Sequence, residues 1–156
     1  MNITIRPATL EDASVIQTLM LDGIGIWGAG LETNLKPWLD VVADLEFIKK
    51  NIENPQYLLF MAEHENTIVG TINLSLEDAE RAHMGGLYCD VKGLGLGTLL
   101  LHYTLEKSRE HGYNKMECEI FDGNIPSIRL MEKYGAYITR VYDVENVTYI
   151  KYEFGL

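Results

Sequence analysis

The middle of the chain carries a hairpin followed by two further strands that a helix connects, and this order limits the possible folds more than any other feature. Tyr57–Glu63 and Thr67–Leu76 are β-rich runs joined by only His64-Glu65-Asn66, which predicts two consecutive antiparallel strands. His83–Asp90 and Lys115–Phe121 are the two further strands. A sheet built from these elements must mix antiparallel pairing with a strand–helix–strand crossover.

Hydrophobic periodicity places a helix in that crossover. Leu96, Leu99, Leu100 and Tyr103 follow the i, i+3, i+4, i+7 spacing of one helix face, and Gly112 is suited to end the helix. The C-terminal part adds one helix and two strands, expected at Ile125–Tyr134, Tyr137–Tyr142 and Thr148–Phe154.

The N-terminal third predicts a short strand and two helices. We expect a strand around Ile3 and Ile5, a helix from Thr9 to Asp22-Gly23, a loop over Gly23–Lys36, and a helix over Trp38–Asn54 that begins after Pro37. The complete order favours an α/β (mixed α+β) fold, in which a twisted mixed sheet of six to seven strands is covered by helices on both faces.

The composition fits a single domain over residues 1–156. With 47% apolar residues, the chain can bury a core without disulfides or metals. No run approaches the roughly 18 apolar residues of a membrane span, and the first residues lack a signal-peptide pattern, so we expect a cytoplasmic protein without a membrane partner. The formal charge of −10 argues against a nucleic-acid partner. Cys89 and Cys118 show no metal-ligand spacing, so we expect reduced thiols and no metal site.

A glycine-rich segment stands between the strand His83–Asp90 and the following helix. Backbone N–H groups at a helix N-terminus bind phosphate groups, and Gly93, Gly95 and Gly97 would let the chain approach such a group closely. A flexible turn would also give this spacing. A Rossmann turn is disfavoured because the segment follows an antiparallel hairpin, and a Walker loop is disfavoured because no Lys stands between Gly97 and Thr98.

Two motifs in this half of the chain carry a family resemblance. The stretch Leu87–Leu100, with Lys92, Gly95 and Gly97 at the motif positions, resembles the pyrophosphate motif Arg/Gln-x-x-Gly-x-Gly/Ala of the Gcn5-related N-acetyltransferases (GNAT). Asn124–Ala136 resembles the second signature of that family, Asn-x-x-Ala/Ser-x-x-Leu-Tyr-x-Lys-x-Gly-Phe. The order of the predicted elements also matches the GNAT fold over essentially the whole chain. The chain is therefore similar to acetyl-CoA-dependent N-acetyltransferases.

The resemblance implies an acetyl-CoA cofactor clamped between the strands His83–Asp90 and Lys115–Phe121. The main chain of Leu87 to Cys89 would pair with the pantetheine amides, and backbone N–H groups from Gly93 to Thr98 would hold the pyrophosphate. A strand N–H would polarise the acetyl group, which a bound primary amine then attacks directly. The residues implied in cofactor binding are Leu87, Tyr88, Cys89, Lys92, Gly93, Leu94, Gly95, Leu96, Gly97, Thr98 and Asn124.

The chain departs from the family pattern at two places. Only two residues separate Cys89 from Lys92, so the loop is two residues shorter than usual, and Lys replaces Arg or Gln. The tyrosine that many members use as a general acid is replaced by Met131, which cannot donate a proton. Tyr134, one helical turn further on, is the candidate substitute, with simple packing beside Gly135 as its alternative role. Water could replace the acid, or no acid is needed, because a CoA thiolate is a tolerable leaving group.

A general base must remove a proton from the acceptor ammonium before the amine can attack. His83 lies where histone-acetylating relatives place a glutamate, and histidine titrates in a suitable range, although a surface histidine would give the same pattern. Glu63, Glu117 and Glu119 are further candidates. Strand alternation sets Glu117 and Glu119 on the face opposite their apolar neighbours, where they could simply face solvent or a helix.

The acceptor side is expected at the connection between the first two helices. Trp27, Glu32 and Trp38 offer an aromatic and acidic lining for a cationic amine, with core packing of either tryptophan as the alternative. The many tyrosines of the C-terminal strands are ordinary for strands. An alternative is that one of these strands forms the sheet edge at which two copies pair in a homodimer.

Three functions remain open at this point. The first is an enzyme that transfers acetyl from acetyl-CoA to a primary amine of a small molecule or a protein, with His83 and Tyr134 as catalytic groups. The second is a catalytically weak or inactive CoA-binding module that acts as a sensor or scaffold, favoured by the short loop and Met131. The third is a nucleotide-phosphate binder that uses the same glycine loop.

Overall fold

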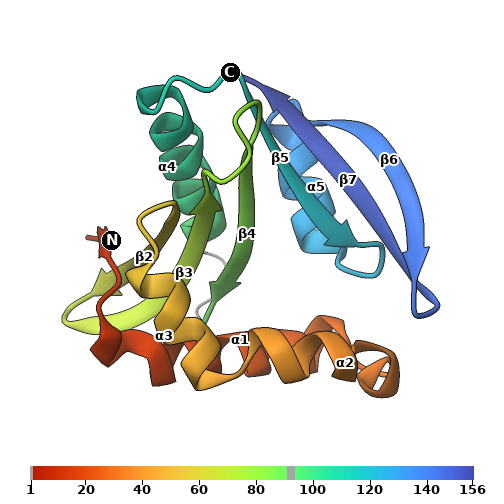
Figure 1. The fold of residues 1–156 in the computed structure, drawn as a ribbon, viewed down its shortest axis with the longest axis horizontal. Coiled ribbons are helices and arrows are strands. Elements are labelled where there is room, and N and C mark those ends of the chain that lie inside the picture. Colours follow the sequence, from red (N-terminus) through yellow and green to blue (C-terminus); the bar gives the residue numbers. More distant parts are fainter. Residues whose placement is uncertain (1, 91–93) are drawn as a thin grey trace.

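The computed structural model describes residues 2–90 and 94–156. Their seven strands form one sheet (Figure 1). The strands are β1 (Thr4–Pro7), β2 (Tyr57–His64), β3 (Thr67–Ser75), β4 (Ala82–Cys89), β5 (Lys115–Phe121), β6 (Tyr137–Val144) and β7 (Val147–Gly155). Their order in the sheet is β1-β2-β3-β4-β5-β7-β6. Only β4 and β5 are parallel among the described neighbouring strands; all the other pairs are antiparallel. The predicted mixed sheet is confirmed.

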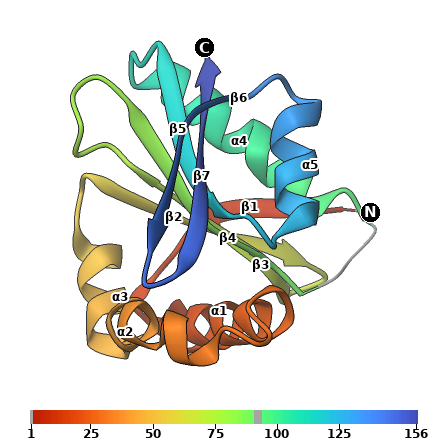
Figure 2. The same ribbon diagram turned by 90° about the vertical axis from the view of Figure 1, so that its right-hand side faces the viewer.

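Helices cover both faces of this sheet, as predicted (Figure 2). One face carries α1 (Ala13–Trp27), α2 (Glu32–Val42) and α3 (Leu45–Glu53), which follow the short 3-10 turn η1 (Leu10–Asp12). The other face carries α4 (Leu96–Glu110) and α5 (Ile125–Lys133). Among the described residues, no helix is both long enough and apolar enough to cross a membrane.

Two tight turns set the hairpins. Glu65 and Asn66 between β2 and β3 have φ values of 50° and 63°, and Glu145 and Asn146 between β6 and β7 have 52° and 61°. Two successive left-handed residues form the type I′ turn, whose twist matches that of paired strands. The hairpin predicted across His64-Glu65-Asn66 is therefore confirmed, although His64 itself belongs to β2.

The predicted loop over Gly23–Lys36 is wrong, because α1 continues through Gly23 to Trp27. Glycine was taken as an end signal, but here it serves close packing. A Cβ atom at position 23 would lie 2.8 Å from the ring carbon Cδ1 of Tyr88 on β4. The missing side chain lets α1 approach the sheet, and the contact involves residues far apart in the sequence.

The single helix predicted over Trp38–Asn54 is two helices. α2 begins at Glu32 and contains Pro37 in its second turn, so proline does not open it. Asp44 separates the two helices: its extended backbone ends the first one, and its Oδ2 accepts a hydrogen bond of 3.0 Å from the N–H of Phe47. This side chain is the N-cap of α3 and stabilises the helix start by about 1 kcal/mol.

The largest part of the core lies between the sheet and the α4–α5 face. Leu100 and Leu101 of α4 are fully buried there against Ile72 of β3 and Met116 of β5. Each such side chain contributes about 1.5–3 kcal/mol by leaving water. The strands that border the candidate site are thus held on a rigid core.

Candidate functional site

Strands β4 and β5 separate soon after they begin. They pair at Ala82 with Met116 and at His83 with Glu117, and no further pair forms along these two fully described strands. Beyond that point their facing edges have no sheet neighbour. Such an edge offers N–H and C=O groups with which an extended ligand can pair. The predicted pair of splayed parallel strands is therefore present.

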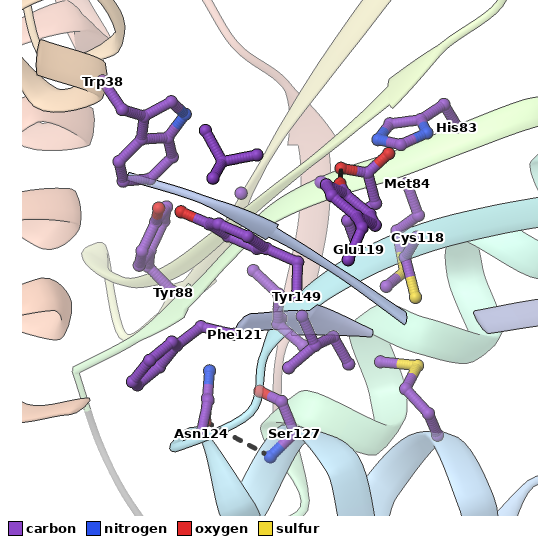
Figure 3. A pocket seen from close by; sticks show the side chains of 17 residues that line it. Trp38, His83, Met84, Tyr88, Cys118, Glu119, Phe121, Asn124, Ser127 and Tyr149 are labelled. Carbon is purple, nitrogen blue, oxygen red and sulfur yellow. Dashed lines mark hydrogen bonds between the residues drawn. The ribbon is translucent and has the colours of Figure 1, made fainter. Parts of the chain in front are cut away.

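A cavity of about 380 Å³, here called the central cavity, lies at this divergence (Figure 3). Its walls come from β4, β5, α5 and the β6–β7 hairpin, and one side chain comes from α2. Its lining residues include Trp38, His83, Gly86, Tyr88, Glu119, Asn124, Met131, Tyr142 and Tyr149.

A second cavity of about 600 Å³, the glycine-loop cavity, lies at the N-terminus of α4. Eight of the predicted cofactor residues line it, namely Leu87, Tyr88, Cys89, Gly95, Leu96, Gly97, Thr98 and Asn124. Leu94 is exposed and is not among the residues that line this cavity. The other two predicted residues, Lys92 and Gly93, lie outside the described part of the chain.

The glycine-loop cavity has the chemistry of an anion site. The first N–H groups of α4 have no carbonyl partner within the helix, and they carry the positive end of the helix dipole. No acidic residue is among the described residues that line the cavity, although the whole chain has a charge of −10. Gly95 has φ +69° and Gly97 has only Leu130 at van der Waals distance, so the backbone stays open to a bulky anion. These residues fit a diphosphate.

A bulge in β4 shapes the wall between the cavities. Tyr88 pairs with Thr71 and Gly85 with Asn73, so Gly86 and Leu87 together face a single residue of β3. Gly86 has φ +56°, and a Cβ atom there would lie 2.3 Å from Nδ2 of Asn73. Any other residue here would strain the backbone and displace the side chain of Asn73. The bulge was not predicted from the sequence, although two adjacent glycines inside a strand are its signal.

His83 lies at the point where the two strands part. Its side chain is 37% exposed, and its Nδ1 is 3.5 Å from Oε1 of Glu117. Lys151 of β7 brings its Nζ to 3.8 Å from Oε2 of Glu117 and 3.5 Å from Oε1 of Glu119. The predicted alternation along β5 is confirmed, and the outward carboxylates meet a lysine and a histidine.

A family model described as the acetyltransferase (GNAT) family matches residues 26–136, the greater part of the chain. The chain belongs to the GNAT acetyltransferase family. This confirms the predicted family and the predicted enzyme class, an acetyl-CoA-dependent N-acetyltransferase.

Solved structures share the GNAT fold along nearly the full chain. PaiA N-acetyltransferase from Thermoplasma acidophilum, in complex with coenzyme A, has a TM-score of 0.84 at 18% identity, over 99% of this chain and 100% of that protein. YncA of Salmonella typhimurium, a putative acetyltransferase with acetyl-CoA, has a TM-score of 0.77 at 20% identity, over 99% of this chain and 94% of that protein. The ribosomal-protein-alanine N-acetyltransferase of Brucella melitensis has a TM-score of 0.77 at 21% identity, over 98% of this chain and 99% of that protein. The predicted cofactor agrees with the two cofactor-bound structures.

Tyr134, expected as the GNAT general acid, lies away from the site. It follows the last residue of α5, and its ring packs edge-on against His102 with 4.7 Å between centroids. It lines none of the cavities at the divergence, whereas Met131 is buried and lines the central cavity. Spacing along α5 did not bring Tyr134 to the face of Met131, so its placement gives no support to a catalytic role.

Two tyrosines that the sequence analysis treated as ordinary strand residues do line the central cavity. Tyr142 and Tyr149 stack with 5.8 Å between ring centroids. Burial, followed by the nearby Glu119 carboxylate, raises the pKa of Tyr149. Burial and the hydrogen bond from its hydroxyl to Glu119 raise the pKa of Tyr142. Both phenols therefore keep their protons at neutral pH.

Glu32 and Trp38, two of the predicted acceptor residues, line different cavities. Glu32 begins α2, accepts a hydrogen bond of 3.0 Å from the N–H of Gly30, and lines a separate cavity between α1 and α2. Trp27 ends α1, and its side chain is outside the described part. Trp38 does line the central cavity. Glu63, a further candidate base, is instead paired with Arg6 at 2.7 Å.

Proposed function

We propose that this protein transfers the acetyl group of acetyl-CoA to a primary amine, which attacks directly in the central cavity. The observation that carries the proposal is the parting of β4 and β5 after His83 and Glu117. It leaves Leu87, Tyr88 and Asn124 in the wall of both the glycine-loop cavity and the central cavity. A cofactor held at one cavity can therefore present its reactive end at the other.

The chain supplies two kinds of contact to the cofactor. The N–H groups at the start of α4, from Gly95 to Thr98, would hold the diphosphate. The unpaired edge of β4 at Leu87 to Cys89 would pair with the pantetheine amides as an added strand, and one of its N–H groups would polarise the acetyl carbonyl. Acetyl-CoA supplies the acetyl thioester when it is bound.

His83 would accept the proton that the acceptor ammonium must lose. Its ring lines the central cavity, and Glu117 at 3.5 Å would stabilise the imidazolium that forms. The amine nitrogen then bonds to the acetyl carbon, the carbon–sulfur bond breaks, and the thiolate leaves with the electron pair. Tyr149, protonated and in the cavity wall, is the candidate proton donor to that thiolate, and its phenolate would take up the second proton, which the nitrogen loses as the amide forms.

The test compares His83→Gln with His111→Gln, an exposed histidine at the far end of α4. With saturating acetyl-CoA, kcat/KM for an amine substrate should fall about 100-fold or more in His83→Gln. His111→Gln should behave as the wild type. Unchanged activity in His83→Gln would remove this histidine from the mechanism.

The methionine at position 131 supports one alternative function, acetyl-CoA binding without turnover. It stands at the position where the family motif has a tyrosine, it lines the central cavity, and it cannot donate a proton. A protein that binds acetyl-CoA without turnover, as a sensor or scaffold, would tolerate this residue. Rapid mixing of the acetyl-CoA complex with an amine panel separates the two: acetylated amine supports the enzyme, and intact acetyl-CoA over hours supports the sensor.

A further inference from the structure

A third cavity extends the central one toward the helices. This helix-side cavity of about 210 Å³ lies between α1–α3 and strands β2–β4. Its walls are largely apolar, with Met20, Phe47 and Leu59 among them. Trp38, His83, Gly85, Gly86 and Tyr88 belong to the walls of both cavities. The two spaces therefore meet at His83 and at the glycine bulge of β4.

Charge in these two cavities is scarce. Among the described residues that line them there is no Lys or Arg, and Glu119 is the one carboxylate. The oxygens of Glu119 are engaged with the Tyr142 hydroxyl and, at 3.5 Å, with Lys151. The cations beside these walls are already engaged: Lys151 pairs with Glu117 and Glu119, and the Arg140 guanidinium lies 4.8 Å from the centre of the Tyr142 ring. A carboxylate or phosphate on an acceptor would therefore compete for an engaged cation, and a second ammonium would lack an uncommitted carboxylate.

Aromatic rings take the place of charges. Trp38, Tyr88 and Tyr149 lie around the central cavity (Figure 3), and Tyr142 also lines it. Trp38 and Tyr88 line the helix-side cavity as well. Faces of aromatic rings attract a single ammonium group, and the apolar walls beyond favour a hydrocarbon or aromatic body. The acidic net charge of the chain favours a cationic molecule over an anionic one.

We propose that the acceptor is a small primary monoamine on an aromatic or bulky apolar body that bears no carboxylate or phosphate. The body lies in the helix-side cavity, and the amine lies beside His83 at the junction with the central cavity. This inference rests on the proposed acetyl transfer and narrows its substrate class.

Four amines test the class with wild-type protein and acetyl-CoA: 2-phenylethylamine, phenylalaninamide, phenylalanine and spermidine. Phenylalaninamide carries a neutral group of the same size as the carboxylate of phenylalanine, which separates charge from bulk. We expect kcat/KM for 2-phenylethylamine to exceed that for phenylalanine by about 100-fold and that for spermidine by at least about 10-fold, with phenylalaninamide nearer to 2-phenylethylamine. Calorimetry with 2-phenylethylamine and the CoA complex should give the same order.

A substitution that adds a cation to the helix-side cavity tests whether the apolar body of the amine binds there. Asn51 of α3 lines the helix-side cavity, and Asn51→Arg would supply the missing cation. The ratio of kcat/KM for phenylalanine to that for 2-phenylethylamine should rise about 10-fold or more. Glu53→Gln, an exposed change at the end of the same helix, adds the same unit of charge outside the cavity and should leave the ratio unchanged.

The outcomes separate this inference from the function on which it rests. Failure to bind acetyl-CoA would overturn both. Binding and turnover in which spermidine or phenylalanine is used as well as 2-phenylethylamine would overturn the substrate class and leave acetyl transfer standing. A ratio that moves equally in Asn51→Arg and Glu53→Gln would refute the placement of the body in the helix-side cavity.

Discussion

The glycine bulge of β4 allows a prediction that can be worked from distances. In Gly86→Ala the new Cβ would meet Nδ2 of Asn73 at 2.3 Å, while its other neighbours lie at 3.5 Å or more. The residue would also keep φ +56°, which costs an L-residue about 1–2 kcal/mol. Relief of the clash costs about 1–3 kcal/mol more. The expected destabilisation is about 3 kcal/mol.

Gly30→Ala is the matched control. Gly30 has φ +86° and no atom within 4 Å of the added Cβ, so it carries the backbone cost without the clash. We expect about 1 kcal/mol there. For a chain of this size, thermal unfolding should shift by about 6–12 °C in Gly86→Ala and about 2–4 °C in Gly30→Ala.

A double-mutant cycle isolates the clash. Asn73→Ala removes the atom that the new Cβ meets, so Gly86→Ala should cost only about 1 kcal/mol in that background. Urea unfolding followed by circular dichroism gives the four free energies. A coupling of about 2 kcal/mol between Gly86 and Asn73 is expected, and additivity within about 0.5 kcal/mol would refute the proposed close contact.

Two further predictions concern titration. Hydrogen bonds from Arg6 at 2.8 and 2.9 Å hold the pKa of Asp12 below its usual value, so the stability they give is present at neutral pH and is lost as pH falls through the lowered pKa. Asp12→Asn should lose about 2 kcal/mol at pH 7, and its deficit in urea unfolding should shrink below about pH 4; a constant deficit would contradict this reading. Burial raises the pKa of Cys89 to about 11 and that of Cys118 to about 12. Iodoacetamide at pH 8 should therefore modify both thiols roughly 100-fold more slowly than free cysteine, as followed by mass spectrometry, and alkylation at the rate of free cysteine would show that they are not buried.

The strands and the last two helices could be predicted because their signals are local. Alternation located β5 at Lys115–Phe121, and glycine after the apolar face of α4 marked its end. In the N-terminal third the short strand and the first helix were predicted, but the end of that helix was missed for a non-local reason. Gly23 is required by the ring of Tyr88, which lies more than sixty residues later in the chain.

The cofactor side of the site was similarly open to sequence reasoning, and the acceptor side was not. Leu87 to Cys89 end β4 and Leu96 to Thr98 begin α4 a few residues later in the sequence, so one motif captures both. Tyr142 and Tyr149 reach the central cavity only because β7 inserts between β5 and β6, a strand order that no short pattern encodes. Helical spacing along α5 also did not determine whether the Tyr134 side chain would point toward the central cavity or away from it.

Calorimetric titration of acetyl-CoA tests the central claim most directly, with wild type, Gly95→Glu and Gly112→Glu compared. Both glycines have positive φ and open space around the added Cβ, but only Gly95 lines the glycine-loop cavity. We predict saturable binding to the wild type and to Gly112→Glu, and an affinity at least about 100-fold weaker in Gly95→Glu, where the carboxylate repels the diphosphate. Wild-type protein that fails to bind at millimolar acetyl-CoA, or Gly95→Glu that binds as the wild type does, would contradict a cofactor site at the start of α4.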